Sequence, residues 1–222
     1  MSVKTHPIPE DRFMDYVAEL NRIRDGVDLP HAACCAFLLG SGARIGEALT
    51  VRIRDVFAPD GTPKERVTRN VEKARADRRI TVTFPWQYLG GPIVAWHGWI
   101  TRHRAAGPED FLFSLRWSGG PISRFSLHRG NRRLLDRLGI PWRGVGLHGL
   151  RKTILRRILA DQIREGRSWI EAMRYCQQFV GHDRLDTTIR YLVDDMPTDN
   201  PDMMRRIFGA QYQQTAQSTD EG

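Results

Sequence analysis

Residues 144–164 read GVGLHGLRKTILRRILADQIR, a glycine-rich turn that leads into a long stretch of helical periodicity. We expect a helix from about His148 to Arg164, because apolar residues recur along it at helical spacing. Its inner face would carry Ile154, Leu155, Ile158 and Leu159. His148 and Arg151 are one helical turn apart at its start, so both can face one point, where the helix N-terminus favours an anion.

The glycines of this turn match the dinucleotide-binding pattern Gly-x-Gly-x-x-Gly between Gly144 and Gly149. That pattern needs a strand before it and an alternating strand–helix series around it. Here Pro141 interrupts the preceding segment, and no such series surrounds it. We therefore interpret the glycines as a turn that frees the approach to His148.

The rest of the chain also favours helices, and it has one pair of strands. Residues 66–72 and 78–84 are expected strands, because Ile80, Val82 and Phe84 alternate with polar residues, and residues 73–77 would link them at a hairpin tip. In the first half of the chain, helices are expected at residues 11–24, from Pro30 to about Gly40 or Gly42 as a buried helix, and at residues 93–104. In the second half, further helices are expected from Ser123 to Gly139, after the capping box Ser168-x-x-Glu171, from Asp186, and from Pro201 as a short helix. Residues 44–56 are expected to form a short helix that runs into an extended piece. The fold class is therefore mainly α with a small antiparallel β-sheet.

The length and composition suit one domain. We expect residues 1–209 to form a single catalytic domain and residues 210–222 to be a polar tail without a core. Cys34, Cys35 and Cys176 have neither disulfide nor metal-ligand spacing, and the first two lie in an apolar run as core residues. No signal peptide core and no membrane-length apolar stretch occurs, so a cytoplasmic protein without membrane attachment is expected.

The charge of the chain favours a phosphate-bearing partner. Lys and Arg number 34 against 26 Asp and Glu, a net charge of +8 in which arginine dominates. The guanidinium fork grips phosphate in a bidentate way, so nucleic acid is the leading partner, although a solvated basic surface would have the same composition.

Two further segments carry candidate site residues. Residues 180–192 read VGHDRLDTTIRYL, which places Tyr191 nine residues after His182. Residues 41–56 read SGARIGEALTVRIRDV, in which Glu47 is one turn after Arg44 and could brace it by a charge-assisted hydrogen bond. Alone, the second of these segments would be interpreted as an exposed ion pair. The first is more specific, because Ile189 and Leu192 already supply the apolar face and Tyr191 need not be a core residue.

Together the three segments resemble the tyrosine recombinase/integrase family of phage-integrase-like enzymes. That family has an Arg box of the form Thr/Ser-Gly-x-Arg-x-x-Glu-x-x-x-Leu, a His-x-x-Arg box and a Gly-His box that ends in the nucleophilic tyrosine, and all three occur here in the family's order between about residues 10 and 195. The resemblance implies that Arg44 and Arg151 grip the scissile phosphate, His148 is the general acid/base, His182 supports the phosphate and the nucleophile, and Tyr191 is that nucleophile. It further implies a hairpin lysine that protonates the leaving oxygen, for which Lys73 is expected and Lys64 is the fallback.

Two departures from the family stand out. Lys152-Thr153 follows the second arginine where the family usually has His-Thr, so Lys152 is a further candidate for phosphate contact. The family's N-terminal core-binding domain is expected to be absent, because Arg44 lies so near Met1.

The resemblance implies a site-specific recombinase or integrase of a mobile element that joins DNA through a 3′-phosphotyrosyl link without cofactor or metal. It also implies double-stranded DNA as partner and a homo-tetramer on DNA. Three alternatives stay open: a type IB topoisomerase-like enzyme that relaxes DNA, an inactive DNA-binding regulator of the same fold, and an unrelated helical binding module.

Overall fold

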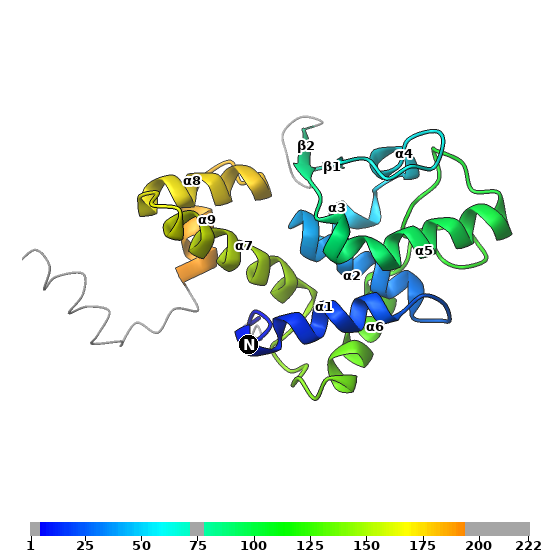
Figure 1. The fold of residues 1–222 in the computed structure, drawn as a ribbon, viewed down its shortest axis with the longest axis horizontal. Coiled ribbons are helices and arrows are strands. Elements are labelled where there is room, and N and C mark those ends of the chain that lie inside the picture. Colours follow the sequence, from blue (N-terminus) through cyan, green and yellow to red (C-terminus); the bar gives the residue numbers. More distant parts are fainter. Residues whose placement is uncertain (1–4, 72–77, 194–222) are drawn as a thin grey trace, which may run out of the picture.

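The computed structural model describes residues 5–71 and 78–193 and places most of them in helices (Figure 1). The helices are η1 (Glu10–Arg12), α1 (Phe13–Arg22), α2 (Leu29–Ser41), α3 (Ile45–Leu49), α4 (Ile53–Val56), α5 (Trp86–Arg104), α6 (Arg124–Arg137), α7 (Leu147–Arg164), α8 (Trp169–Val180) and α9 (Leu185–Val193). The strands are β1 (Arg66–Asn70) and β2 (Arg79–Thr83). The expected fold class, mainly α with a small antiparallel sheet, is confirmed.

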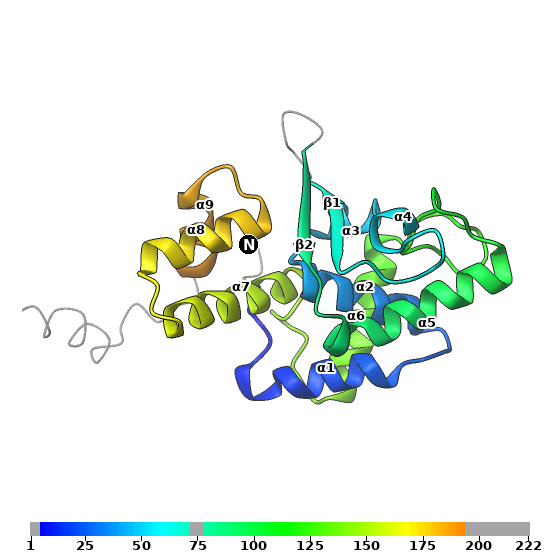
Figure 2. The same ribbon diagram turned by 45° about the horizontal axis from the view of Figure 1, so that its top comes forward.

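Helix α2 is the centre of the larger of two apolar cores. It is apolar on all sides, and a helix of that kind is stable only when it is surrounded. Helices α1, α5, α6 and α7 pack around it (Figures 1 and 2). Cys34 and Cys35 are fully buried there, as expected. Gly42 ends the helix in the left-handed conformation, with φ of 62°.

The two strands form the expected hairpin. They pair antiparallel from Arg66 opposite Thr83 to Asn70 opposite Arg79. Val67 and Val82 turn inward, while the exposed positions of both strands carry polar side chains. The predicted tip at residues 73–77 lies outside the described residues.

A smaller apolar core joins the second half of α7 to α8 and α9. Leu155 and Leu159 of α7 pack there with Met173, Cys176 and Leu192. In both ribbon views α8 and α9 lie beside the far end of α7, away from α1 and α5 (Figures 1 and 2). The expected capping box begins α8, since Ser168 N donates to the Glu171 carboxylate over 2.9 Å. The smaller core fixes where α9 and its tyrosine lie.

Helix α5 is longer than the sequence predicts. We expected it from about Ile93, after Gly90-Gly91-Pro92, whereas it starts at Trp86 and contains Pro92. A proline inside a helix removes the N–H that would bond the carbonyl four residues earlier. Here the carbonyl of Tyr88 instead accepts a 2.5 Å hydrogen bond from Nδ2 of Asn21, which lies in α1. A tertiary contact thus replaces the missing helical one.

The expected extended piece after α3 is present but shorter than predicted, because α4 follows it. The chain is extended around Arg52, which forms an isolated bridge with Phe111, and then turns into α4. Asp55 caps the N-terminal end of this short helix by accepting a 2.9 Å hydrogen bond from Arg52 N. A helix of four residues is too short to show a hydrophobic period.

The start of α7 is packed closely by the N-terminal segment. His6 N donates to Gly144 O over 2.5 Å, and a Cβ added at Gly149 would lie 2.3 Å from His6 O. Gly149→Ala should therefore destabilise the fold by about 1–3 kcal/mol, because backbone must move to relieve the overlap. Urea unfolding would measure this, with Gly107→Ala as the control, since a Cβ there meets nothing closer than 4.0 Å. Equal stability of the two variants would contradict the close packing.

The expected helix from Pro201 and the polar tail at residues 210–222 lie outside the described residues. The domain bounds expected from the sequence stay a prediction.

Candidate active site

Three chain segments that are distant in sequence meet at one place. They are the junction between α2 and α3, the first turn of α7, and the turn from α8 into α9. Arg44 stands at the N-cap of α3, Arg151 in the first turn of α7, and His182 directly after Gly181, which ends α8. Tyr191 follows on α9 and contacts the start of α7. The three sequence boxes therefore come together in the fold.

Arg151 is the buried centre of this site. Only 1% of its surface is exposed, and its guanidinium donates to Gly42 O and, over 3.1 Å, to Val180 O. Its Nε is buried and has no hydrogen-bond partner among the described residues. Burial, and next the charge of Arg44, lower the pKa of Arg151 to about 9, so it stays a cation at neutral pH. Arg151 is therefore a fixed, buried positive charge at the centre of the site.

Glu47 braces Arg44 as the sequence suggested, but the pair is not on the surface. Arg44 Nη1 lies 2.9 Å from Glu47 Oε1, and Arg44 N donates to Oε2 over the same distance. The Glu47 side chain is fully buried, while the Arg44 side chain is 28% exposed. The guanidinium of Arg44 is thus partly open to solvent, and its charged hydrogen bond to buried Glu47 fixes its position.

Sequence reasoning missed Arg69. This β1 residue is buried and places Nη1 2.5 Å from Glu47 Oε2. A signal existed, since Arg69 shares the inward face of the strand with Val67 at period two. An arginine on the buried face of a strand requires a buried partner of opposite charge.

His182 is held between the second arginine and α9. Arg151 Nη2 lies 3.1 Å from its Nε2, and its Nδ1 lies 2.8 Å from Thr188 Oγ1. Because a guanidinium only donates, Nε2 must accept, and the ring proton therefore sits on Nδ1. Burial first, and then the charges of Arg151 and Arg44, lower the pKa of His182 to about 3. The imidazole is neutral and oriented at neutral pH.

His148 is the more open histidine of the pair. Loss of hydration in the crowded site, and then the charges of Arg151 and Lys152, lower its pKa to about 4. Its ring has an exposed side, so it can exchange protons with solvent or a substrate. The imidazole is therefore neutral at neutral pH, which is the form that a general base needs.

Tyr191 lies against both histidines. Its ring centroid is 4.9 Å from that of His148 and 5.9 Å from that of His182, edge-on to each. Its hydroxyl donates a long 3.4 Å hydrogen bond to His148 O. Lys152 Nζ lies 5.5 Å from the ring centroid, within the range of a cation–π contact. Lys152, expected as a candidate for phosphate contact, contacts the tyrosine ring in this structure.

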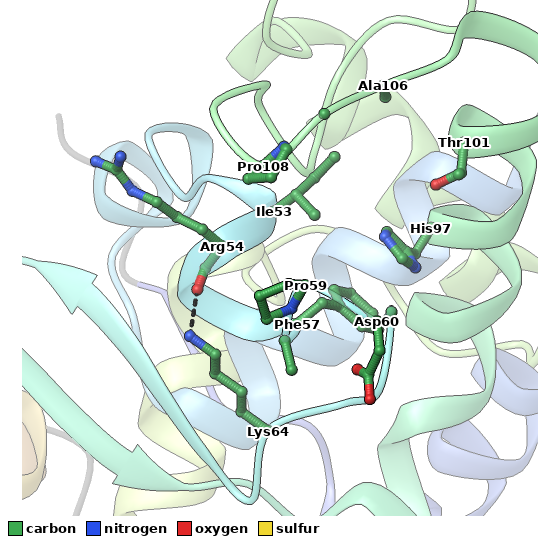
Figure 3. Close-up of a pocket in the computed structure, with 13 residues that line it drawn as sticks. Ile53, Arg54, Phe57, Pro59, Asp60, Lys64, His97, Thr101, Ala106 and Pro108 are labelled. Carbon is green, nitrogen blue, oxygen red and sulfur yellow. Dashed lines mark hydrogen bonds between the residues drawn. The ribbon is translucent and has the colours of Figure 1, made fainter.

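The described residues do not test the predicted hairpin lysine. Lys73 lies outside the described residues. Lys64, the fallback, precedes β1 at the end of the hairpin opposite to the link between the strands. Its Nζ donates to Arg54 O over 2.6 Å beside a pocket lined by Phe57, Pro59 and His97 (Figure 3). The structure therefore gives Lys64 a different location from the one expected.

The neutral state of His182 predicts a pH dependence of stability. Its folded pKa is lowered, so its contribution to stability is present above the unfolded value of about 6.5 and is lost as pH falls toward the folded value. Between about pH 7.5 and about pH 5, the free energy of unfolding should fall by roughly 1–2 kcal/mol more in the wild type than in His182→Gln. Urea unfolding at the two pH values would measure it, with exposed His103→Gln as the control. Parallel losses in wild type and His182→Gln would contradict a neutral His182.

Neither a metal-binding cluster nor a membrane-spanning helix is found in the part of the chain that the structure describes. Over residues 5–71 and 78–193, no group of three or more His, Cys, Asp or Glu side chains could hold a metal ion. Within the same residues, no helix has the length and apolarity that a membrane crossing requires.

Similarity to known proteins is detected through the fold. No family model and no curated protein matches the sequence. The XerH site-specific recombinase bound to palindromic difH substrate superposes with a TM-score of 0.65 at 16% identity, over 88% of this chain and 51% of XerH. XerA recombinase gives 0.59 at 20% identity over 94% of this chain and 65% of XerA. A lambda integrase dimer bound to a COC′ core site gives 0.58 at 14% identity, over 90% of this chain and 51% of the integrase.

The chain spans about half the length of XerH and of lambda integrase. At these identities the likeness concerns the fold. The protein has the fold of tyrosine recombinase catalytic domains, with an arginine–histidine–tyrosine cluster where its three sequence boxes meet.

Proposed function

We propose that this protein is a site-specific DNA recombinase or integrase that cleaves and rejoins DNA through Tyr191. The observation that carries the proposal is the convergence of Arg44, His148, Arg151, His182 and Tyr191 on one point from separate elements. The likeness in fold to structures of DNA-bound recombinases supports the same kind of function.

Each group has a role in the proposed reaction that its surroundings favour. The Tyr191 oxygen attacks a backbone phosphorus, the bond from phosphorus to the 5′ oxygen breaks, and a 3′-phosphotyrosine and a 5′ hydroxyl result. Arg44 and Arg151 neutralise the negative charge that develops on the non-bridging oxygens. His148 takes the phenol proton and can return it in the reverse step, since its lowered pKa keeps it neutral. Religation regenerates the phosphodiester without an external energy source.

A hairpin lysine, Lys73, would deliver a proton to the leaving 5′ oxygen. This role rests on the family resemblance, as do the tetramer on DNA and the mobile-element context. Double-stranded DNA is the proposed partner, and the arginine-rich charge excess would give its binding a strong salt dependence.

A covalent trap tests the proposal. The protein would be incubated with a pool of random-sequence duplexes, each nicked so that the cleaved fragment diffuses away, and adducts would be collected under denaturing conditions. We expect adducts joined at a 3′ phosphate and free 5′ hydroxyl ends that a polynucleotide kinase can label. Adducts joined at a 5′ phosphate, or none with any duplex, would contradict the proposal. Relaxation of supercoiled DNA without strand exchange would instead favour the topoisomerase-like alternative.

A further inference from the structure

Arg69 is a buried cation outside the three sequence boxes. Its side chain is 0% exposed, and its guanidinium is held by contacts inside the protein. Taking a guanidinium out of water costs several kcal/mol unless charged and polar partners replace the lost hydration. Arg69 has two such partners, the Glu47 carboxylate and the carbonyl of Phe179.

The first partner connects Arg69 to both phosphate-binding arginines of the proposed site. Glu47 Oε2 lies 2.5 Å from Arg69 Nη1 and 3.7 Å from Arg151 Nη1, while Oε1 lies 2.9 Å from Arg44 Nη1. Among these three guanidinium groups, that of Arg69 is closest to the carboxylate. These three guanidinium groups share one carboxylate, so among the four described groups positive charge is in excess. If Arg69 were removed, more of the carboxylate charge would fall on Arg44 and Arg151.

The second partner connects Arg69 to the segment that carries His182. Arg69 Nη2 donates to Phe179 O, and Arg151 Nη2 donates to the next carbonyl, Val180 O, each over 3.1 Å. These carbonyls are at the C-terminal end of α8, where the helix dipole favours cations. Gly181 and His182 follow at once. Two arginines from different elements thus hold the end of α8 beside the histidine.

We propose that Arg69 is a positioning residue of the phosphate site. It supplies the counter-charge of Glu47, which leaves the positive charge of Arg44 and Arg151 available to a phosphate. It also fixes the end of α8, which keeps His182 against Arg151. This inference rests on the proposed function in taking the anion to be a DNA phosphate.

A compensating substitution distinguishes an electrostatic role of Arg69 from a role in folding alone. Arg69→Gln leaves the Glu47 charge without its closest cation, and Arg69→Gln with Glu47→Gln removes both charges. We expect Arg69→Gln to weaken inorganic phosphate binding about tenfold, the order of one unit charge about 10–12 Å away at an effective dielectric constant of about 20. The double variant should return to within about threefold of wild type. Phosphate titrations followed by NMR of the histidine ring protons would measure both affinities.

Arg66→Gln is the matched control, because it removes the same charge from the exposed start of the same strand. It should leave phosphate affinity unchanged at physiological ionic strength, where exposed charges are screened. A structural role alone would lower the melting temperature of Arg69→Gln without changing the phosphate affinity of the folded protein. It would also give no recovery in the double variant, and either result would overturn the proposal.

Arg69→Lys keeps the test decisive if Arg69→Gln does not fold. It retains the positive charge, so phosphate affinity should stay within about threefold of wild type. It lacks the planar guanidinium that bonds both Glu47 and Phe179 O, so His182 is placed less precisely and adduct formation should slow about tenfold. A loss of phosphate affinity in this variant as large as tenfold would overturn the charge argument.

The proposed function and the role of Arg69 can be contradicted independently of each other. If the wild type binds phosphate but forms no DNA adduct, the nucleophile assignment is wrong and the phosphate data still decide the role of Arg69. Absence of phosphate binding by the wild type would overturn this inference directly.

Discussion

Tyr191→Phe is expected to abolish covalent attachment to DNA while leaving the fold and DNA affinity nearly intact. The substitution removes only the attacking oxygen, whose bond to His148 O is long at 3.4 Å. The phenylalanine ring would keep the edge-on contacts to His148 and His182. We expect a stability change of about 1 kcal/mol or less, the usual worth of one such hydrogen bond. Denaturing gels of the trapped complex would measure the adduct.

Tyr175→Phe is the control for this experiment. Tyr175 lies on α8 and is 43% exposed, and it contacts neither histidine of the site in the described structure. It should form adduct at the wild-type rate. An adduct that persists in Tyr191→Phe would assign the nucleophile to another residue. If neither the wild type nor Tyr175→Phe attaches to any nicked duplex, the result favours the alternative of an inactive DNA-binding regulator.

The elements that position the site could be predicted because their signals are local. The αL glycine after α2, the Ser168 capping box and the alternation in β2 each depend on a few neighbouring residues. The meeting of the three boxes followed from a family resemblance rather than from any pattern of spacing. The structure supplies what the resemblance did not contain, namely the hydrogen-bond partners of each group.

The predictions that failed depend on contacts between distant residues. Helix α5 continues through Pro92 because Asn21 bonds the carbonyl of Tyr88. No local rule could have shown this. Arg69 escaped notice because its partners, Glu47 and Phe179, are 22 and 110 positions away. A buried cation can be recognised from sequence only when the strand face it occupies is already known.

Arg151→Ala is expected to have the second large effect, and the structure changes how that effect must be measured. Loss of one preorganised cation opposite the developing charge typically costs roughly 10²–10³ in rate. Arg151 also donates to Gly42 O and Val180 O in the interior, so the alanine variant leaves two buried carbonyls without this donor. Each unsatisfied group costs about 1–3 kcal/mol. The variant should therefore lose stability as well as activity.

Arg151→Lys separates the two losses. Lysine keeps the positive charge but cannot donate at once to both carbonyls and to His182 in the fixed geometry of the guanidinium fork. We expect it to recover part of the phosphate affinity and little of the cleavage rate, because His182 loses the donor that orients its ring. Single-turnover adduct formation at a temperature where both variants are folded would measure the rates. Cleavage by Arg151→Lys at the wild-type rate would mean that charge alone suffices, and that the orientation of His182 by the guanidinium has no part in the chemistry.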